Sequence, residues 1–317
     1  MTAVHLVTAA GSDEGRGHLA RALAMAEALT GIGARVTLEL LRGAPSPADA
    51  ARIRDLGLTA EPPAEPAAVL VDVPDPNEVA DRRPRERLAV FDDRELLRGA
   101  AALVIQPSLA RWGGSADARR VLEGYAYAPV RASLRRLAAE RPDDATPPAV
   151  VVCFGGSDPA DVSARVVPAI AAAGSWSTVA ILGPGYRGRL TKAGDALDDT
   201  VRVLRDPADL DRLLATATLV VGGGGTMKFE LAILGRATIL LAVADDQRPV
   251  GPPFAATGAA RFLGDGRSID PAEVGVAVAT LMMDTGARSA MATRGREVVD
   301  GRGAERIAAA VLELAGA

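Results

Sequence analysis

The chain has 317 residues, 49% hydrophobic and 24% charged, a composition typical of a globular protein large enough for two domains. Aromatic residues make up only 3% and the net charge is −4, which argues against nucleic-acid or anionic-membrane partners. The single cysteine, Cys153, excludes an intrachain disulfide and a cysteine-based metal cluster, and its apolar neighbours predict a core residue. Without a basic-then-apolar leader or an apolar run of about 18 residues, we expect a cytoplasmic protein without membrane insertion.

The first half of the chain alternates short apolar strands with helices, which predicts an α/β domain. Continuous apolar strands of this kind are typical of a parallel sheet, whose ligands bind at the carboxyl ends of the strands. Strands are predicted at Ala3–Thr8, Arg35–Leu41, Ala68–Val73, Arg87–Phe91 and Ala101–Ile105, and helices at about Gly17–Leu29 and Pro47–Leu56.

The second half repeats this alternation after a polar, proline-rich segment, Glu140–Pro148, that predicts a linker. Its strands are predicted at Val150–Phe154, Ser177–Leu182, Val201–Leu204, Thr218–Val221 and Ala237–Val243, and its last helices at about Pro271–Met283, Ala287–Val298 and Ala304–Leu314. We therefore predict two doubly wound domains, 1–145 and 146–317, that face a cleft, with a last helix able to pack back on the first domain.

A run of four glycines, 222–225, joins a predicted buried strand to a helix that begins near Thr226. Glycines let a backbone approach a ligand closely, and a helix start offers unpaired amides and the positive end of its dipole to a phosphate. Glu230 follows about one turn into the helix, where its carboxylate could accept two ribose hydroxyls. These features predict a diphosphate seat, and the absence of a following Gly-Lys-Ser/Thr argues against an ATPase loop.

A second glycine loop precedes the first helix and has two interpretations. As a dinucleotide fingerprint, Gly15, Gly17 and Ala20 would be followed by the ribose-binding acid Glu39. A fingerprint glycine follows its strand directly, however, whereas six residues separate Thr8 from Gly15. The spacing therefore weakens the nicotinamide interpretation.

The same loop also reads as Gly-x-Gly-His-x-x-Arg, which presents His18 as a general base or a water-orienting group at a helix start. Its amides and Arg21 would then face a substrate, and a capping loop with an exposed histidine is the structural alternative. The only other histidine, His5, lies in the middle of a predicted strand, so we expect it to be structural and disfavour a histidine metal site.

Polar residues also follow three other predicted strands. Asp92 and Asp93 could orient His18, accept a substrate hydroxyl, hold a metal or cap a turn or helix, and we favour Asp93 as the catalytic one. Asp158 or the serine before it could cap the helix that follows the second domain's first strand. The predicted binding residues are Gly15, Gly17, Arg21, Gly155, Gly156, Ser157, Gly222, Gly223, Gly224, Gly225, Thr226, Glu230, Asp246 and Gln247.

Six motifs in chain order resemble one family. They are Gly-x-Gly-His-x-x-Arg at 15–21, Val-Phe-Asp-Asp at 90–93, Tyr-Ala-Pro-Val-Arg at 127–131, Phe-Gly-Gly-Ser-Asp at 154–158, Gly-Gly-Gly-Thr-x-x-x-Glu at 223–230 and Gln247. The chain is similar over nearly its whole length to the pseudaminic-acid-pathway UDP-sugar hydrolases and the spore-coat polysaccharide glycosyltransferase-like proteins. More distantly, it resembles the N-acetylglucosaminyltransferases of peptidoglycan synthesis.

This resemblance implies a GT-B fold of two Rossmann-like domains, with the nucleotide held by the second. It implies that 222–226 bind the diphosphate, that Glu230 binds the ribose and that His18 acts at the anomeric carbon without a metal or another cofactor. Asp246 stands where the family has asparagine, which leaves the donor sugar open.

We therefore expect an enzyme that hydrolyses a nucleotide sugar, UDP-linked, by cleaving its anomeric C–O bond with water as the acceptor. A GT-B glycosyltransferase with a small-molecule or polysaccharide acceptor is the nearest alternative. An NAD-dependent oxidoreductase and a non-catalytic nucleotide-sugar-binding protein are alternatives of other classes.

Overall fold

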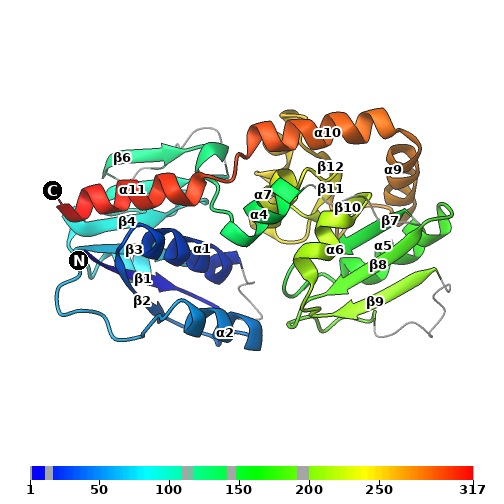
Figure 1. The fold of residues 1–317 in the computed structure, drawn as a ribbon. Helices are drawn as coiled ribbons and strands as arrows, with labels where there is room; N and C mark the ends of the chain where they lie inside the picture. Colours follow the sequence, from blue (N-terminus) through cyan, green and yellow to red (C-terminus); the bar gives the residue numbers. More distant parts are fainter. Residues whose placement is uncertain are drawn as a thin grey trace. The chain divides into compact units, whose positions relative to one another are not determined.

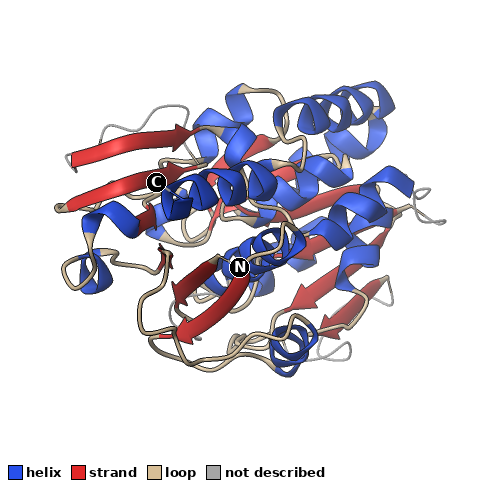
Figure 2. Ribbon diagram, turned by 60° about the vertical axis from the view of Figure 1, so that its left-hand side comes forward, coloured by secondary structure: helices blue, strands red, loops and turns tan. Residues whose placement is uncertain are grey.

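The computed structural model describes residues 2–10, 17–108, 114, 117–140, 148–190 and 200–316. The chain forms two compact units (Figures 1 and 2), one of Met1–Ala132 with Asp300–Ala317 and one of Ser133–Val299. The domain boundary expected near residue 145 falls in 141–147, outside the described residues, and stays a prediction.

The first unit is built on a six-stranded parallel sheet in the order β2-β1-β3-β4-β5-β6. Its strands are β1 Ala3–Thr8, β2 Arg35–Leu40, β3 Ala68–Asp72, β4 Leu88–Phe91, β5 Ala100–Gln106 and β6 Asp117–Glu123, and its helices are α1 Gly17–Gly31, α2 Pro47–Asp55, α3 Asn77–Ala80 and α11 Gly303–Gly316. Alanine, valine and leucine make up most of the central strands β3, β4 and β5, and their nearly continuous burial explains the unbroken apolar runs in the sequence.

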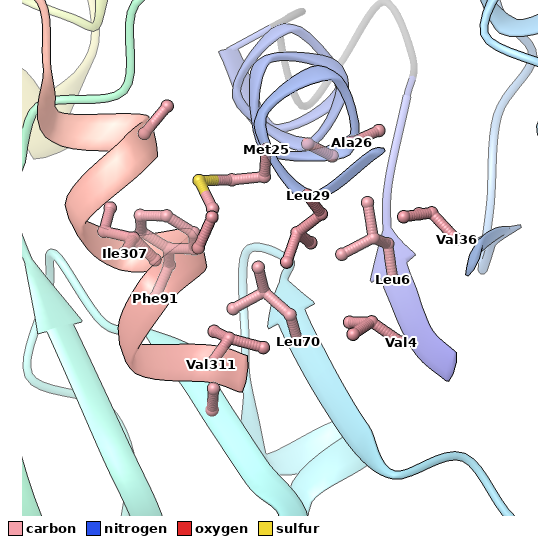
Figure 3. Packing of buried hydrophobic residues seen from close by; sticks show 14 of the residues in the cluster. Val4, Leu6, Met25, Ala26, Leu29, Val36, Leu70, Phe91, Ile307 and Val311 are labelled. Atoms are coloured by element: carbon pink, nitrogen blue, oxygen red, sulfur yellow. The ribbon is translucent and has the colours of Figure 1, made fainter. Parts of the chain in front are cut away.

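The C-terminal helix α11 completes the core of the first unit. Ile307 and Val311 are fully buried beside Met25 of α1 and Leu70 of β3, and Figure 3 shows these side chains pointing toward one another. At about 25 cal/mol per Å² of buried apolar surface, such aliphatic side chains each contribute on the order of 2 kcal/mol. Helix α11 therefore belongs to the first unit although it lies last in the chain.

The second unit has a six-stranded parallel sheet in the order β12-β11-β10-β7-β8-β9. Its strands are β7 Ala149–Cys153, β8 Ser177–Leu182, β9 Val201–Arg205, β10 Leu219–Gly223, β11 Thr238–Ala242 and β12 Arg261–Asp265. Its helices are α5 Val162–Ala172, α6 Leu210–Thr216, α7 Met227–Leu234, α8 Gly251–Ala256, α9 Pro271–Met283 and α10 Thr285–Val298, while α4 Ala132–Glu140 begins at the last residue of the first unit. This strand order is that of a Rossmann sheet.

Each sheet reverses its strand order at one position, between β1 and β3 in the first unit and between β7 and β10 in the second. Connections leave in opposite directions at such a switch point, and the crevice outside the carboxyl ends of the two strands is where ligands bind. The predicted site residues follow from this topology: His18 comes after β1, and the glycine loops at 155 and 222 come after β7 and at the end of β10.

Every predicted strand is present with ends within two residues of the expected ones. The sequence did not predict β6 and β12, which lie at sheet edges and have mostly half-exposed or exposed residues. An edge strand needs no continuous apolar run, so its signal is weak. Within the described ranges, no helix is long and apolar enough to span a membrane.

Candidate functional site

The first candidate region lies at the switch point of the first unit. Helix α1 begins at Gly17, so His18 and Arg21 lie on its first turns, three residues apart and on the same face. The His18 Nδ1 atom lies 2.7 Å from Oδ1 of Asp72, the last residue of β3. Gly15, the other predicted glycine of this loop, lies outside the described residues.

Asp72 is held in place by its neighbours and is only 2% exposed. The guanidinium of Arg21 donates to both of its carboxylate oxygens, from Nε at 2.7 Å and from Nη2 at 2.6 Å. The hydroxyl of Thr8, at the end of β1, donates to the Asp72 backbone carbonyl at 2.9 Å. A bidentate arginine fixes both the position and the plane of a carboxylate, so Asp72 is a rigid partner for His18.

Arg21 was expected to contact substrate, but its guanidinium points into the protein. Besides Asp72 it binds Asp93 through Nη1, and it lies 4.5 Å from the centre of the Phe91 ring. Its side chain is 5% exposed. Arg21 therefore links two acids from the ends of neighbouring strands, β3 and β4, within the unit.

The charges of this cluster stabilise one another. Burial alone would raise the pKa of Asp72, but the charges and hydrogen bonds of Arg21 and His18 outweigh it and lower that pKa. Burial likewise opposes the charge of Arg21, whose pKa is nevertheless raised by Asp72 and Asp93. Asp72 is therefore an anion at neutral pH.

An ionised Asp72 determines which nitrogen of His18 carries the proton. A carboxylate only accepts hydrogen bonds, so Nδ1 must donate and the neutral ring presents Nε2 as its proton acceptor. The His18 side chain is 23% exposed, so the ring is not sealed within the core. The pair has the arrangement of a general base oriented by an acid.

The two acids after β4 have different surroundings. Asp92 is 2% exposed and accepts hydrogen bonds from the amides of Leu96 and Leu97 at 2.8 and 3.1 Å, which makes it a turn cap. Asp93 binds Arg21 through one oxygen, and its other oxygen, Oδ1, is buried without a hydrogen-bond partner among the described residues. Of the two, Asp93 is thus the one that joins the charged cluster of His18.

The other histidine has a structural environment. His5 is fully buried in β1, where Nδ1 contacts the Thr37 hydroxyl and Nε2 contacts the Glu39 carboxylate, both at 2.9 Å. Glu39, the acid of the nicotinamide interpretation, also lies 3.6 Å from Arg83. Its carboxylate therefore already has two partners within the sheet region.

The second candidate region is the glycine loop at the switch point of the second unit. Gly222 and Gly223 end β10, Gly224 and Gly225 form a bend, and Thr226 precedes α7. A Cβ atom added to Gly222 would lie 3.2 Å from the carbonyl oxygen of Cys153 in β7, so this position favours glycine. Gly225 and Thr226 are half-buried, which leaves backbone of the loop accessible.

Gln247 fastens this loop from the turn after β11. Its Oε1 accepts from the amide of Gly224 at 3.0 Å and from the amide of Val243 at 3.1 Å. Gln247 was predicted to bind substrate, but its side-chain oxygen is engaged with the backbone of the loop and of the strand end. Asp246 is exposed.

Glu230 lies half-buried in the first turns of α7. Burial raises the pKa of the Cys153 thiol to about 11, and the charge of Glu230 adds to this shift, so the carboxylate lies near the carboxyl end of β7. Cys153 itself is 2% exposed, as expected of a core residue.

The turn after β7 lies beside the glycine loop in the sheet order. Gly155 has a φ of +83°, a conformation that favours glycine, and Asp158 accepts from the amides of Val162 and Ser163 at the start of α5. The cap is therefore Asp158, while Ser157 lies in the turn itself. A Cβ on Gly183 would lie 2.4 Å from the carbonyl oxygens of Gly155 and Gly156, so the next turn packs tightly against this one.

Two residues that sequence reasoning did not assign are central to these regions. Asp72 was part of the predicted strand end Ala68–Val73, and an acid at the end of an otherwise apolar strand was the available signal. Lys228 is 1% exposed in α7, and its Nζ donates to the carbonyls of Gly224 and Gly225. A lysine in the helix after the glycine loop was the available signal, but the sequence does not show where its ammonium group points.

No protein-family model and no curated protein matches the chain. Solved structures match it over nearly its full length. Acinetobacter baumannii MurG is 15% identical, with a TM-score of 0.62 and coverage of 99% of this chain and 100% of its own. The glycosyltransferase of kitacinnamycin is 17% identical, with a TM-score of 0.66 and coverages of 99% and 98%. The spinosyn rhamnosyltransferase SpnG complexed with thymidine diphosphate is 18% identical, with a TM-score of 0.62 and coverages of 99% and 100%. At these identities the likeness establishes the fold alone: the chain has the GT-B fold, with two Rossmann-like parallel-sheet units.

Proposed function

We propose that the protein is a glycosyltransferase that moves the sugar of a nucleoside-diphosphate sugar to a hydroxyl acceptor. The observation that carries this proposal is the contact between His18 Nδ1 and the buried, arginine-bound Asp72. It prepares Nε2 to take a proton from an acceptor hydroxyl. The glycosyltransferase neighbours favour transfer over the hydrolysis expected from the motifs.

The proposed reaction has one bond-forming and one bond-breaking event at the anomeric carbon. The acceptor hydroxyl gives its proton to His18 Nε2 while its oxygen attacks that carbon. The bond from the anomeric carbon to the diphosphate oxygen breaks with its electron pair, and the nucleoside diphosphate leaves as an anion. Asp72 stabilises the imidazolium that forms, without taking the proton itself.

The leaving diphosphate is assigned to the second unit. The amides of Gly225 and Thr226 and the start of α7 provide donors where negative charge develops. Glu230 is assigned to the ribose hydroxyls, and Gln247 holds the loop in shape. SpnG and a further structural neighbour, the glycosyltransferase VinC, have each been solved with thymidine diphosphate, which supports a pyrimidine nucleoside diphosphate as the product.

The test is release of nucleoside diphosphate from UDP- and dTDP-sugars, measured with and without a panel of hydroxylated acceptors. Acceptor-dependent release together with a glycosylated product supports transfer. Equal release at a catalytic rate without acceptor replaces transfer by hydrolysis. A protein that binds none of these sugars, or that retains a nicotinamide nucleotide on purification, overturns the proposal.

A further inference from the structure

Lys228 is an unusual charge for its place in the fold. It is 1% exposed, in the first turn of α7, and its ammonium lies 4.3 Å from the centre of the Phe229 ring. An ammonium group is desolvated at such a position, which is unfavourable unless the group is well hydrogen-bonded. The chain has 36 basic residues but only two lysines, Lys192 and Lys228, so a compact ammonium is the exception among its cations.

The contacts of Lys228 are with the glycine loop. Its Nζ donates to the carbonyl oxygen of Gly224 at 3.0 Å and to that of Gly225 at 3.2 Å. The Gly225 carbonyl also accepts from the backbone amide of Lys228 at 3.3 Å. Two consecutive peptide groups of the loop are therefore held with their oxygens toward the buried ammonium.

The geometry of the peptide bond fixes the direction of the N–H groups in these two peptides. In a trans peptide the C=O and N–H bonds point in opposite directions. The carbonyl of Gly224 shares its peptide plane with the amide of Gly225, and the carbonyl of Gly225 shares its plane with the amide of Thr226. Both amides therefore point away from Lys228.

These two amides are available for a ligand. Within the described part of the chain, neither donates to a protein acceptor, and both residues are half-buried rather than enclosed. The preceding amide, of Gly224, is bound by Gln247 and by the Leu241 carbonyl at 3.1 Å. In this loop, the amide of Gly224 is bound within the protein, while the amides of Gly225 and Thr226 remain able to bind a ligand.

We propose that Lys228 is a positioning residue of the diphosphate site: it draws two carbonyls inward so that the amides of Gly225 and Thr226 meet the diphosphate. Its buried charge also favours the leaving anion electrostatically. This inference rests on the proposed function and extends it to a residue that does not touch the substrate through its side chain.

The first test compares Lys228→Met with the wild type in binding UDP, dTDP and the corresponding nucleosides. Loss of the ammonium should weaken diphosphate binding by about 10- to 100-fold, the range for a charged hydrogen-bonding group, and nucleoside binding by about threefold or less. Ile233→Ala, on the same helix and 5% exposed in the wild type, controls for a general loosening of α7 and should leave both affinities unchanged.

The outcomes separate the two proposals. A wild type that binds neither diphosphate overturns the proposed function together with this inference. A wild type that binds one of them, while Lys228→Met binds it equally well, overturns the inference alone. An equal loss for diphosphate and nucleoside also overturns it, because that result indicates a merely structural role.

A second test needs no variant of Lys228. Lysine labelled with ¹⁵N at Nζ gives one signal for each of the two lysines, and Lys192→Arg identifies the signal of Lys228. The signal should shift when UDP or dTDP, whichever the wild type binds, is added, and should shift much less with the nucleoside. A Lys228 signal that stays in place at saturation with the diphosphate overturns the inference.

Discussion

The candidate regions at the two switch points differ in composition: one consists of charged side chains and the other of backbone amides. In the first unit, the candidate region is built from side chains: His18, Asp72, Arg21 and Asp93 form a charged cluster with little exposed surface. In the second unit, the candidate region is built from backbone, because the glycine loop presents amides. The side chains of Gln247 and Lys228 hold this loop through hydrogen bonds to its backbone.

This difference matches the two tasks that the proposed reaction sets. A base has to exchange a proton, which needs a titratable ring held in one tautomer. A leaving diphosphate needs fixed donors whose direction does not change during the reaction. Substitutions in the first unit should therefore change turnover, and substitutions in the second should change binding.

The largest expected effect comes from removing the base. His18→Ala should lower turnover by about 10²- to 10⁴-fold, the usual contribution of a general base, while the affinity for nucleoside diphosphate stays near that of the wild type. Steady-state rates and calorimetric binding measure the two quantities. Unchanged turnover would remove His18 from the reaction, and a parallel loss of affinity would break the division between the units.

The next largest effect should be that of Asp72→Asn, which should lower both the unfolding free energy and turnover. It leaves Arg21 buried with only Asp93 as an anionic partner, and breaking a buried ion pair in this way is expected to destabilise a protein by about 3–5 kcal/mol. Chemical denaturation of the variant measures this loss. A loss below about 1 kcal/mol would contradict the view that the cluster is tightly coupled.

The same residue sets a pH dependence of the unfolding free energy. Because folding lowers the pKa of Asp72, its stabilising contribution is complete above the unfolded value of about 3.8 and is lost as the pH falls through the lower folded value. The wild type should thus lose more stability than Asp72→Asn between neutral pH and the acid range. Parallel pH profiles for the two proteins would refute this assignment.

In the second unit, Gln247→Ala should cost about 1–3 kcal/mol of unfolding free energy, because the amides of Gly224 and Val243 lose their shared acceptor. Asp246→Ala is the matched control for stability, since Asp246 is exposed on the same turn and its loss should change the unfolding free energy by less than about 0.5 kcal/mol. Equal values for the two variants would show that Gln247 does not hold the loop.

Glu230→Ala should act on binding, and we expect it to weaken nucleoside-diphosphate binding by roughly 1–3 kcal/mol. A 2′,3′-dideoxynucleoside diphosphate, which lacks the hydroxyls assigned to Glu230, should bind wild type and variant equally. If the variant loses affinity for this analogue as well, the assigned contact with the ribose is wrong.

The predictability of the fold and of the two regions has physical reasons. Buried parallel strands carry their own signal, so all ten predicted strands are present, while the polar edge strands β6 and β12 lacked such a signal. Glycines at strand ends marked where a ligand could approach. The side-chain partners of a residue could not be predicted from the sequence: Arg21 was expected to bind substrate, yet Asp72 and Asp93, far from it in sequence, bind its guanidinium inside the unit.

The placement of α11 has a consequence for the order in which the protein is made. The core of the first unit needs Ile307 and Val311, which are synthesised after the whole of the second unit. The second unit, Ser133–Val299, can therefore complete its core first, and the N-terminal part must wait in an incomplete state. We expect a chain that ends at Val299 to keep a protease-resistant second unit and to expose the first, which limited proteolysis of that shortened chain would reveal.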